Sequence, residues 1–269
     1  MRRYAAAYQA EWLKTLSVRS WWVLGLVMVL YIGFTSALLG LMFTEVFGEM
    51  GVEAIDGFSP AATLYTLGSA MGYLFPVLLG ALAVTTEYRY HTITPTFLSV
   101  GRRGPVLAAK VTVQGLMGAV YGVAALLSAV LGSVFFFIGR GMSTGLTDGS
   151  TWLMFLRMIV AMGLWGIIGV GLGALIRSQA AAIVVVLVFT QFIEPLARMG
   201  GAFNSVAASI TRFLPGSVSD AFVGQSIYTA MTATGSVPLS WWVGGLVLAG
   251  YGAVLVLVAY FTRWRSDVS

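Results

Sequence analysis

Six mostly apolar stretches alternate with polar connections along this chain. A helix needs roughly 20 apolar residues to cross a bilayer, so each stretch predicts a membrane helix. The predicted helices cover residues 21–43, 61–86, 105–138, 152–176, 179–196 and 241–261. We therefore expect an all-α fold: a polytopic membrane protein with six transmembrane helices in a single transmembrane domain, residues 1–269.

The first 20 residues are patterned but too polar to cross a membrane. Tyr4, Tyr8, Trp12 and Leu16 occupy every fourth position, with polar and charged residues between them. This spacing puts the four side chains on one face of a helix. Residues 1–20 are thus predicted to form a cytoplasmic amphipathic helix at the membrane interface, anchored by its aromatic residues.

Residues 197–240 separate the last two apolar stretches. They contain apolar runs on either side of Pro215 and Gly216. A bare loop of this length is uncommon in an ordered protein. We expect short extracellular re-entrant helices here, between helices 5 and 6.

The basic residues are distributed unevenly among the connections. Eleven of the 15 Lys and Arg residues fall before the first helix, after the last, or in alternate loops: Arg2, Arg3, Lys14, Arg19, Arg89, Arg102, Arg103, Lys110, Arg177, Arg263 and Arg265. Because cytoplasmic loops of membrane proteins are enriched in Lys and Arg, this side is predicted to be the cytoplasm. Both termini are then cytoplasmic, as six spans require.

The amino-acid composition excludes several classes of protein and of binding site. Charged residues make up 9% of the chain, against about 25% in soluble domains, so lipid must cover much of the surface. The net charge of +5 reflects the basic loops, and no basic run with interleaved aromatics predicts a nucleic-acid partner. With no cysteine and His91 as the single histidine, disulfides, zinc–thiolate sites, iron–sulfur clusters and bis-histidine haem are excluded.

Two absences argue against an enzyme or an ion-coupled pump. Neither Lys14 nor Lys110 lies in the glycine-rich context of a phosphate-binding loop, so we expect no bound cofactor and no catalysis by this chain alone. The interiors of the first, second, third and sixth predicted helices carry no ionisable residue. Proton relays and intramembrane proteases need such residues, so energy for any transport should come from another subunit.

Glycines four residues apart predict close helix packing. The pairs are Gly68 and Gly72, Gly118 and Gly122, and Gly169 and Gly173. Such spacing lets two helix backbones approach within a bundle or a dimer.

The end of the fifth predicted helix carries Glu194, Pro195 and Arg198. The two charges are four residues apart, in the order that favours a helical ion pair, and the proline is expected to bend the helix. These residues are candidates for an outer gate; the alternative is an ion pair that caps the span.

The cytoplasmic loop of residues 87–104 changes from polar to amphipathic. Thr94 followed by Pro95 predicts an N-cap and first turn, and the helix is expected to run to about Val100 and end at Gly101. A short helix between two membrane helices can transmit motion from a cytoplasmic partner. The alternative is an ordinary interfacial loop.

Several segments, in order along nearly the whole chain, resemble the permease subunits of ABC-2 type ABC transporters, particularly those of actinobacteria. They are Glu-Tyr-Arg at residues 87–89, Thr-Ile-Thr-Pro-Thr at 92–96, Arg-Arg at 102–103, Ala-Ala-Lys at 108–110, Glu-Trp-Leu-Lys at 11–14, the glycine-rich run 169–177 and Leu-Pro-Gly at 214–216. His91 departs from the glycine of the family pattern, which puts the geometry of that turn in question.

The resemblance implies a permease in a bacterial plasma membrane. It would pair with a second copy or a homologous permease and bind two cytoplasmic ABC ATPase subunits that hold ATP and Mg. The coupling site implied by the family consists of Glu87, Tyr88, Arg89, His91, Thr92, Ile93, Thr94, Pro95, Phe97 and Leu98. The implied activity is export of amphipathic drug, peptide or lipid-like substrates.

Other functions remain open on the sequence. The first alternative is a secondary transporter or channel without an ATPase partner. A structural or assembly protein and a lipid-modifying enzyme are the others.

Overall fold

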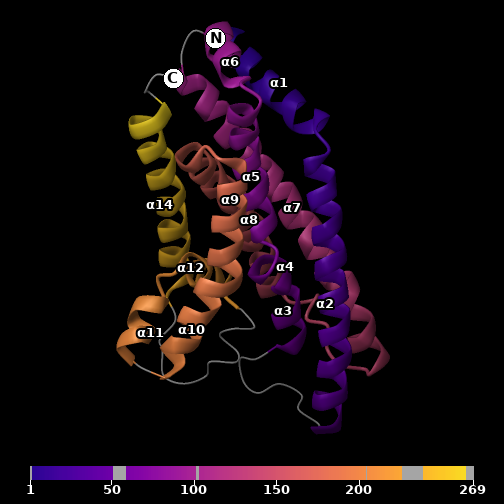
Figure 1. Ribbon diagram of the computed structural model, residues 1–269. Helices are drawn as coiled ribbons and strands as arrows, with labels where there is room; N and C mark the ends of the chain where they lie inside the picture. The colour runs from indigo at the N-terminus through magenta and orange to yellow at the C-terminus, as the bar shows by residue number, and fades with distance from the viewer. Residues whose placement is uncertain (1, 51–58, 101–102, 204, 226–238, 265–269) are drawn as a thin grey trace.

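The structure is a computed structural model that describes residues 2–50, 59–100, 103–203, 205–225 and 239–264. The described residues form helices that run side by side, with no strand among them (Figure 1). Six segments are long and apolar enough to cross a membrane: Ser20–Glu45, Pro60–Arg89, Arg103–Gly139, Gly149–Ile176, Gln179–Gly201 and Trp241–Thr262. The all-helical, multi-pass organisation is confirmed to that extent.

Four spans consist mainly of single helices: α2 (Ser20–Met50), α7 (Arg103–Gly139), α8 (Gly149–Ile176) and α14 (Trp241–Ala259), the last continuing into the π-helical η2 (Tyr260–Trp264). The second span comprises α3 (Pro60–Tyr65), α4 (Leu67–Ala70) and α5 (Leu74–Arg89). The fifth comprises α9 (Gln179–Val188), the π-helical η1 (Phe189–Ile193) and most of α10 (Glu194–Phe203). The shorter helices are α1 (Arg2–Ser17), α6 (Ile93–Val100), α11 (Ser205–Thr211) and α12 (Pro215–Val223).

The second span is built from three helices instead of one. The break before α5 follows from Pro76, which lies in the first turn of that helix. Proline has no N–H, so a continuous helix would leave the Gly72 carbonyl without its usual donor. The Phe75 N–H donates to this carbonyl instead, at 3.1 Å.

The fifth span is longer than predicted, since it reaches Gly201 and not residue 196. Pro195 is the second residue after η1, the π-helical turn in which the helix widens. A proline at this position cannot donate to the Gln191 carbonyl, and a π-helical turn is one way in which a helix accommodates the missing bond.

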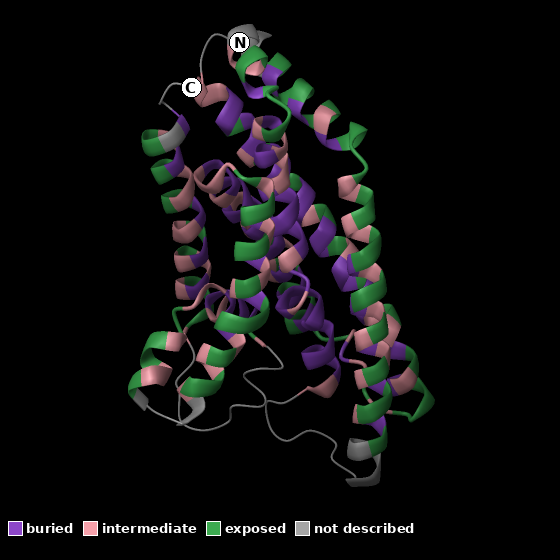
Figure 2. Ribbon diagram, in the orientation of Figure 1, coloured by how far each residue is buried: buried purple, intermediate pink, exposed green. Residues whose placement is uncertain are grey.

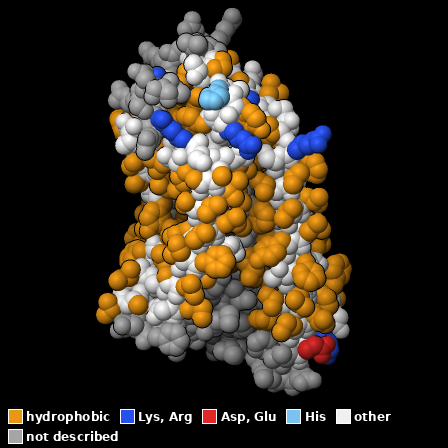
Figure 3. Space-filling model, viewed as in Figure 1, with side chains coloured by type: hydrophobic (Ala, Val, Ile, Leu, Met, Phe, Trp, Pro, Cys, Tyr) orange, Lys and Arg blue, Asp and Glu red, His pale blue; other side chains and the backbone are white. Residues whose placement is uncertain are grey.

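Helix α8 lies at the centre of the bundle, packed against α5, α7 and α14 (Figure 1). Buried residues gather along α5, α7 and α8, whereas α2, α9 and α14 each expose one side (Figure 2). On the face in Figure 3, apolar side chains cover the middle of the surface and basic side chains lie near the end that carries α6. This distribution suits a protein with lipid around its middle.

The predicted glycine pair on α8 brings it against α5. A Cβ atom built on Gly169 would lie 2.2 Å from the Val77 carbonyl oxygen, and one on Gly173 would lie 2.5 Å from the Ala81 carbonyl oxygen. No side chain fits in either space, so the two backbones are in direct contact.

The second pair packs α7 on α8 in the same way. A Cβ atom on Gly118 would lie 2.4 Å from the Met162 carbonyl oxygen. In the third pair, a Cβ atom on Gly68 would meet the Met158 side chain of α8 at 2.5 Å and the Ala125 carbonyl oxygen of α7 at 3.0 Å, whereas the atom nearest to one on Gly72 is the Gly68 carbonyl oxygen of its own segment. Close helix packing is thus confirmed for two pairs and for half of the third.

The predicted short helices between the last two spans are present where the structure describes this region. They are α11, α12 and the end of α10, and residues 226–238 lie outside the described part. Pro215 opens α12 as its first residue, a position where the missing N–H is harmless.

We expect Gly169→Ala to lower the free energy of unfolding by about 1–3 kcal/mol, because the added Cβ would force α5 and α8 apart. The matched control is Gly250→Ala on α14, where a Cβ meets nothing within 4 Å and alanine favours the helix. Thermal unfolding of both variants in one detergent checks this. Equal stability of Gly169→Ala and the parent would contradict the backbone contact.

Candidate functional site

The end of α5 forms a turn that sets the direction of α6. The Thr92 N–H donates to the Glu87 carbonyl at 3.0 Å, and the His91 N–H donates to the Tyr88 carbonyl at 3.3 Å. This pair of bonds defines a Schellman motif, in which the left-handed position is usually glycine. His91 occupies that position with φ 55°, so the turn keeps the left-handed conformation although it carries a histidine.

Helix α6 begins slightly earlier than predicted. It covers Ile93–Val100, which places Thr94 and Pro95 in its first turn, so Thr94 is not the N-cap. The Thr96 hydroxyl donates to the Thr92 carbonyl at 2.8 Å and holds this turn. Pro95 is tolerated because N–H groups of a first turn have no partner within their helix. The predicted end at Gly101 lies outside the described residues.

One face of α6 is fixed by an aromatic cluster. Ile93 is 1% exposed, and the Phe97 ring lies 5.3 Å from the Trp264 ring at the end of η2. The Trp264 indole N–H donates to the Arg103 carbonyl at 2.8 Å. The cluster therefore joins α6 to the end of the sixth span and the start of the third.

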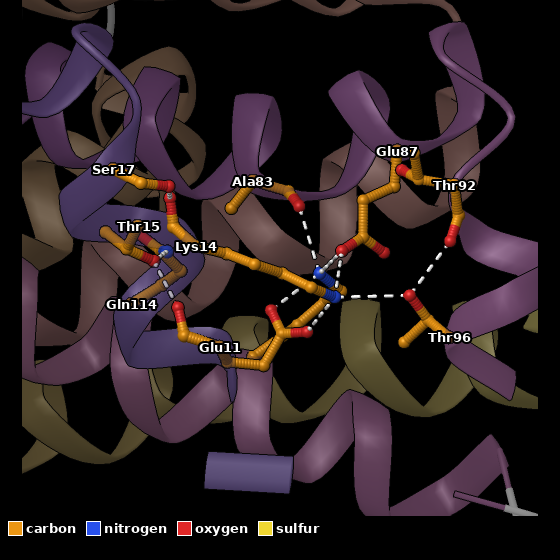
Figure 4. A network of polar contacts seen from close by, with 10 residues as sticks. Glu11, Lys14, Thr15, Ser17, Ala83, Glu87, Thr92, Thr96 and Gln114 are labelled. Carbon is orange, nitrogen blue, oxygen red and sulfur yellow. Dashed lines mark hydrogen bonds and ion pairs between the residues drawn. The ribbon is translucent and has the colours of Figure 1, made fainter. Parts of the chain in front are cut away.

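Beside α6, four charged side chains from α1, α5 and α7 form a closed ring (Figure 4). Lys110 Nζ lies 2.7 Å from Glu11 Oε2 and 3.0 Å from Glu87 Oε1. Lys14 Nζ lies 2.9 Å from Glu11 Oε1 and 2.7 Å from Glu87 Oε1. Each charge thus touches two of opposite sign, and we call these four residues the charge ring.

Both ammonium groups of the ring have a third acceptor. Lys110 donates to the Ala83 carbonyl of α5 at 3.1 Å. Lys14 donates to the hydroxyl of Thr96, on α6, at 3.2 Å (Figure 4). An ammonium has three donors, so the contacts of each lysine match its hydrogen-bonding capacity.

The charge ring is buried except at one member. The Lys110 side chain is 1% exposed and both carboxylates are buried, whereas the Lys14 side chain is 41% exposed. Burial alone would lower the pKa of Lys14, but its hydrogen bonds and the charges of Glu87 and Glu11 outweigh this and raise it. Lys14 therefore stays charged at neutral pH.

The polar side of helix α1 faces the rest of the protein. Glu11 and Thr15 are buried against α7, where the Thr15 hydroxyl accepts from Gln114 Nε2 at 3.0 Å. Tyr8, Trp12 and Leu16, from the predicted apolar stripe, are exposed. The side chain of Tyr4 lies outside the described part. This is the reverse of the arrangement in a water-soluble protein.

The predicted coupling residues fall into two groups. His91, Thr92, Thr94 and Pro95 are exposed, as is Tyr90, which sequence reasoning did not select. Arg89 is exposed too, and its guanidinium donates to the Gln179 side-chain oxygen at 3.0 Å. The others make internal contacts: Glu87 lies in the ring, the Tyr88 ring faces the Arg177 guanidinium, and Ile93 and Phe97 lie in the aromatic cluster. The side chain of Leu98 lies outside the described part.

Lys14 and Lys110 were missed as partners of Glu87, as was Glu11, which contacts the same two lysines. The signal available in the sequence was the scarcity of charge: the chain has only two lysines, and both belong to the ring. Charged residues so rare in an apolar chain are expected to pair. The identity of each partner depends on the packing of α1 on α7, which no short-range pattern specifies.

At the opposite end of the bundle, the predicted outer residues form a second polar cluster. Arg198 Nη2 lies 2.9 Å from Glu194 Oε1, which confirms the predicted ion pair. Arg198 Nη1 lies 2.7 Å from Asp220 Oδ2 of α12, a partner that was not predicted. Both carboxylates are buried, and Tyr73, at the start of α5, donates to Glu194 Oε2 at 3.4 Å.

Glu194 also holds the beginning of α12. Its Oε1 accepts the Ser217 N–H at 3.1 Å, whereas Leu214, at the N-cap position, has no side chain that could do so. A carboxylate at a helix N-terminus satisfies orphan N–H groups and interacts favourably with the helix dipole. The cluster thus ties the fifth span to α12.

Among the described residues, no group of three or more His, Asp or Glu side chains could hold a metal ion. No protein-family model matches the chain, and no curated protein matches it significantly. A proposal for function therefore depends on the sequence and on the geometry of the α6 region.

Lys110→Met should lower the free energy of unfolding by about 3–5 kcal/mol, because two buried carboxylates would then share one lysine. Adding Glu87→Gln should restore much of this loss, since the Glu11–Lys14 pair remains and Glu87 Oε2, the second oxygen, has no hydrogen-bond partner to lose. Unfolding of both single variants and the double variant tests the coupling. Purely additive losses would show that the ring does not act as a unit.

His91→Gly should raise the free energy of unfolding by about 0.5–1 kcal/mol, because glycine adopts φ 55° without strain. His91→Ala is the control: it removes the imidazole but keeps a Cβ, so the strain remains. Thermal unfolding separates the two. A stabilisation by alanine equal to that by glycine would assign the effect to the imidazole and not to the backbone.

Proposed function

We propose that this chain is the transmembrane permease subunit of an ATP-driven ABC transporter, of the ABC-2 type that its sequence resembles. The observation that carries the proposal is α6, a short helix between α5 and α7 with one face fixed by Ile93 and Phe97 and exposed residues at its start. A partner that pressed on α6 would act on the ends of several spans at once, because α6 contacts α7 and η2 and follows α5 directly.

The contact surface for an ATPase would be the exposed turn before α6 and its first residues. Tyr90, His91 and Thr94 would meet the partner directly. Glu87 would support this surface without touching the partner, because it holds the end of α5 in the charge ring. This arrangement divides the family's coupling segment into contact residues and supporting residues.

The remaining parts of the assembly follow from the same resemblance. Two cytoplasmic ATPase subunits would bind ATP and Mg, and this chain would be non-catalytic. A second copy or a homologous permease would complete the dimer in a bacterial plasma membrane. The gathering of basic side chains near the α6 end supports a cytoplasmic position for that end and for both termini (Figure 3).

Helix α1 would lie in the cytoplasmic membrane interface. Its exposed side chains include Trp12 and Leu13, and its buried ones include Glu11 and Thr15. A helix with an apolar outer face and a polar inner face is stable where lipid covers the outside.

The opposite end would be extracellular. There α10, α11 and α12 would be the re-entrant helices, and Glu194, Pro195 and Arg198 would belong to an outer gate. The translocation path would lie at the dimer interface, lined by the second and fifth spans. Amphipathic drugs, peptides or lipid-like molecules would suit its apolar lining, and export would be the direction.

The test is co-purification of an ATPase with the tagged chain in mild detergent, followed by an ATPase assay. Tyr90→Ala and Thr94→Arg should weaken the association several-fold without changing the unfolding temperature, because both side chains are exposed. Trp152→Ala is the control, since Trp152 is equally exposed at the opposite end of the bundle and should leave the association unchanged.

If no ATPase co-purifies, and none restores activity when co-expressed, the permease proposal is wrong. A channel or secondary transporter that needs no ATPase would then be favoured. If Trp152→Ala weakens the association as much as Thr94→Arg, the partner does not bind at α6.

A further inference from the structure

The charge ring divides into two pairs that are each neutral. Glu11 and Lys14 both belong to α1 and lie 2.9 Å apart. Glu87 and Lys110 belong to α5 and α7 and lie 3.0 Å apart. A buried charge is strongly destabilising when its partner is removed. Separating α1 from the bundle would leave no charge of the ring without a partner, because each half keeps its own ion pair.

The rest of the contact between α1 and the bundle is small and polar. Among the described side chains of α1, Ala7 is the one apolar group that is buried. The large apolar side chains of this helix, such as Trp12 and Leu13, face outward. The other fully buried side chains of α1 are Glu11 and Thr15, so its buried contact with the bundle is mainly polar. The ion pairs that cross between α1 and the bundle, Glu11 with Lys110 and Lys14 with Glu87, hold α1 in place together with the hydrogen bond from Gln114 to Thr15.

Docked α1 also reaches α6. Lys14 Nζ donates to Thr96 Oγ1 at 3.2 Å across the ring (Figure 4). Lys14 is also the partly exposed member of the ring, so its contacts can be exchanged for water at the surface. Release of α1 would remove a donor from both Thr96 and Glu87, whereas the contacts of Ile93 and Phe97 would remain.

We propose that α1 is a releasable latch, which docks by exchanging ion pairs with Glu87 and Lys110 and fixes the position of α6 through Lys14. The latch has two states, docked and released, and both keep every charge of the ring paired. The inference goes beyond the proposed function, since it concerns only contacts within the chain and holds with or without an ATPase.

The chain has no cysteine, so two introduced cysteines can carry spin labels without a background. Gln9→Cys on α1 and Thr94→Cys on α6 are both at exposed positions. Electron–electron double resonance in detergent should give one main distance in the otherwise unchanged chain. With Glu11→Gln and Lys14→Met added, the ratio of docked to released chains should fall by roughly tenfold or more, as expected when charge-assisted hydrogen bonds are lost.

Two controls keep the test decisive. Ser17→Ala changes a residue of α1 outside the ring, whose hydroxyl donates to the Lys14 carbonyl, and should leave the distance unchanged. The unfolding temperature of the Glu11→Gln, Lys14→Met variant should stay near that of the parent, because Glu87 and Lys110 remain paired. An unchanged distance in this variant would overturn the latch. So would a large drop in its unfolding temperature, which would make α1 a fixed part of the bundle.

Discussion

Close contact between helix backbones is the constraint on which the rest of this structure depends. In lipid, helices gain little from burying apolar side chains against each other, because lipid tails are equally apolar. Association must come from tight packing, and here Gly169 and Gly173 of α8 lie directly on carbonyl groups of α5, while Gly118 of α7 lies on α8. These contacts leave no freedom to rotate one helix against the next. The direction of α5, and therefore the position of both of its ends, is fixed by them.

Each end of α5 meets a polar cluster because of that placement. Glu87, near one end, enters the charge ring, and Tyr73, just before the other, reaches Glu194. Between them the helix is apolar and packed on α8. Charges are expensive in the middle of a bilayer and tolerable near its surfaces when they are paired. The two clusters are therefore where polar contacts between spans can form without large cost, and α5 connects them.

The parts of this arrangement that depend on local pattern could be predicted from the sequence. All six spans, the helix over residues 93–100, the Glu194–Arg198 pair and most of the glycine contacts follow from composition and spacing. The break before α5 in the second span was missed, because hydropathy does not register the effect of Pro76 on the ladder of hydrogen bonds. The partners of Glu87 were missed because Lys110 is distant in sequence and the position of Lys14 depends on where α1 docks.

The amphipathic pattern of α1 predicts its two faces but not which residues the polar face contacts. In a soluble protein the stripe with Tyr8, Trp12 and Leu16 would face the core, and in this structure it faces outward. The reason is that Glu11, on the polar side of α1, has buried Lys110 to pair with, whereas lipid can cover the aromatic stripe on the other side. The charges thus decide which side of α1 faces the protein, and through Lys14 they decide what lies beside α6.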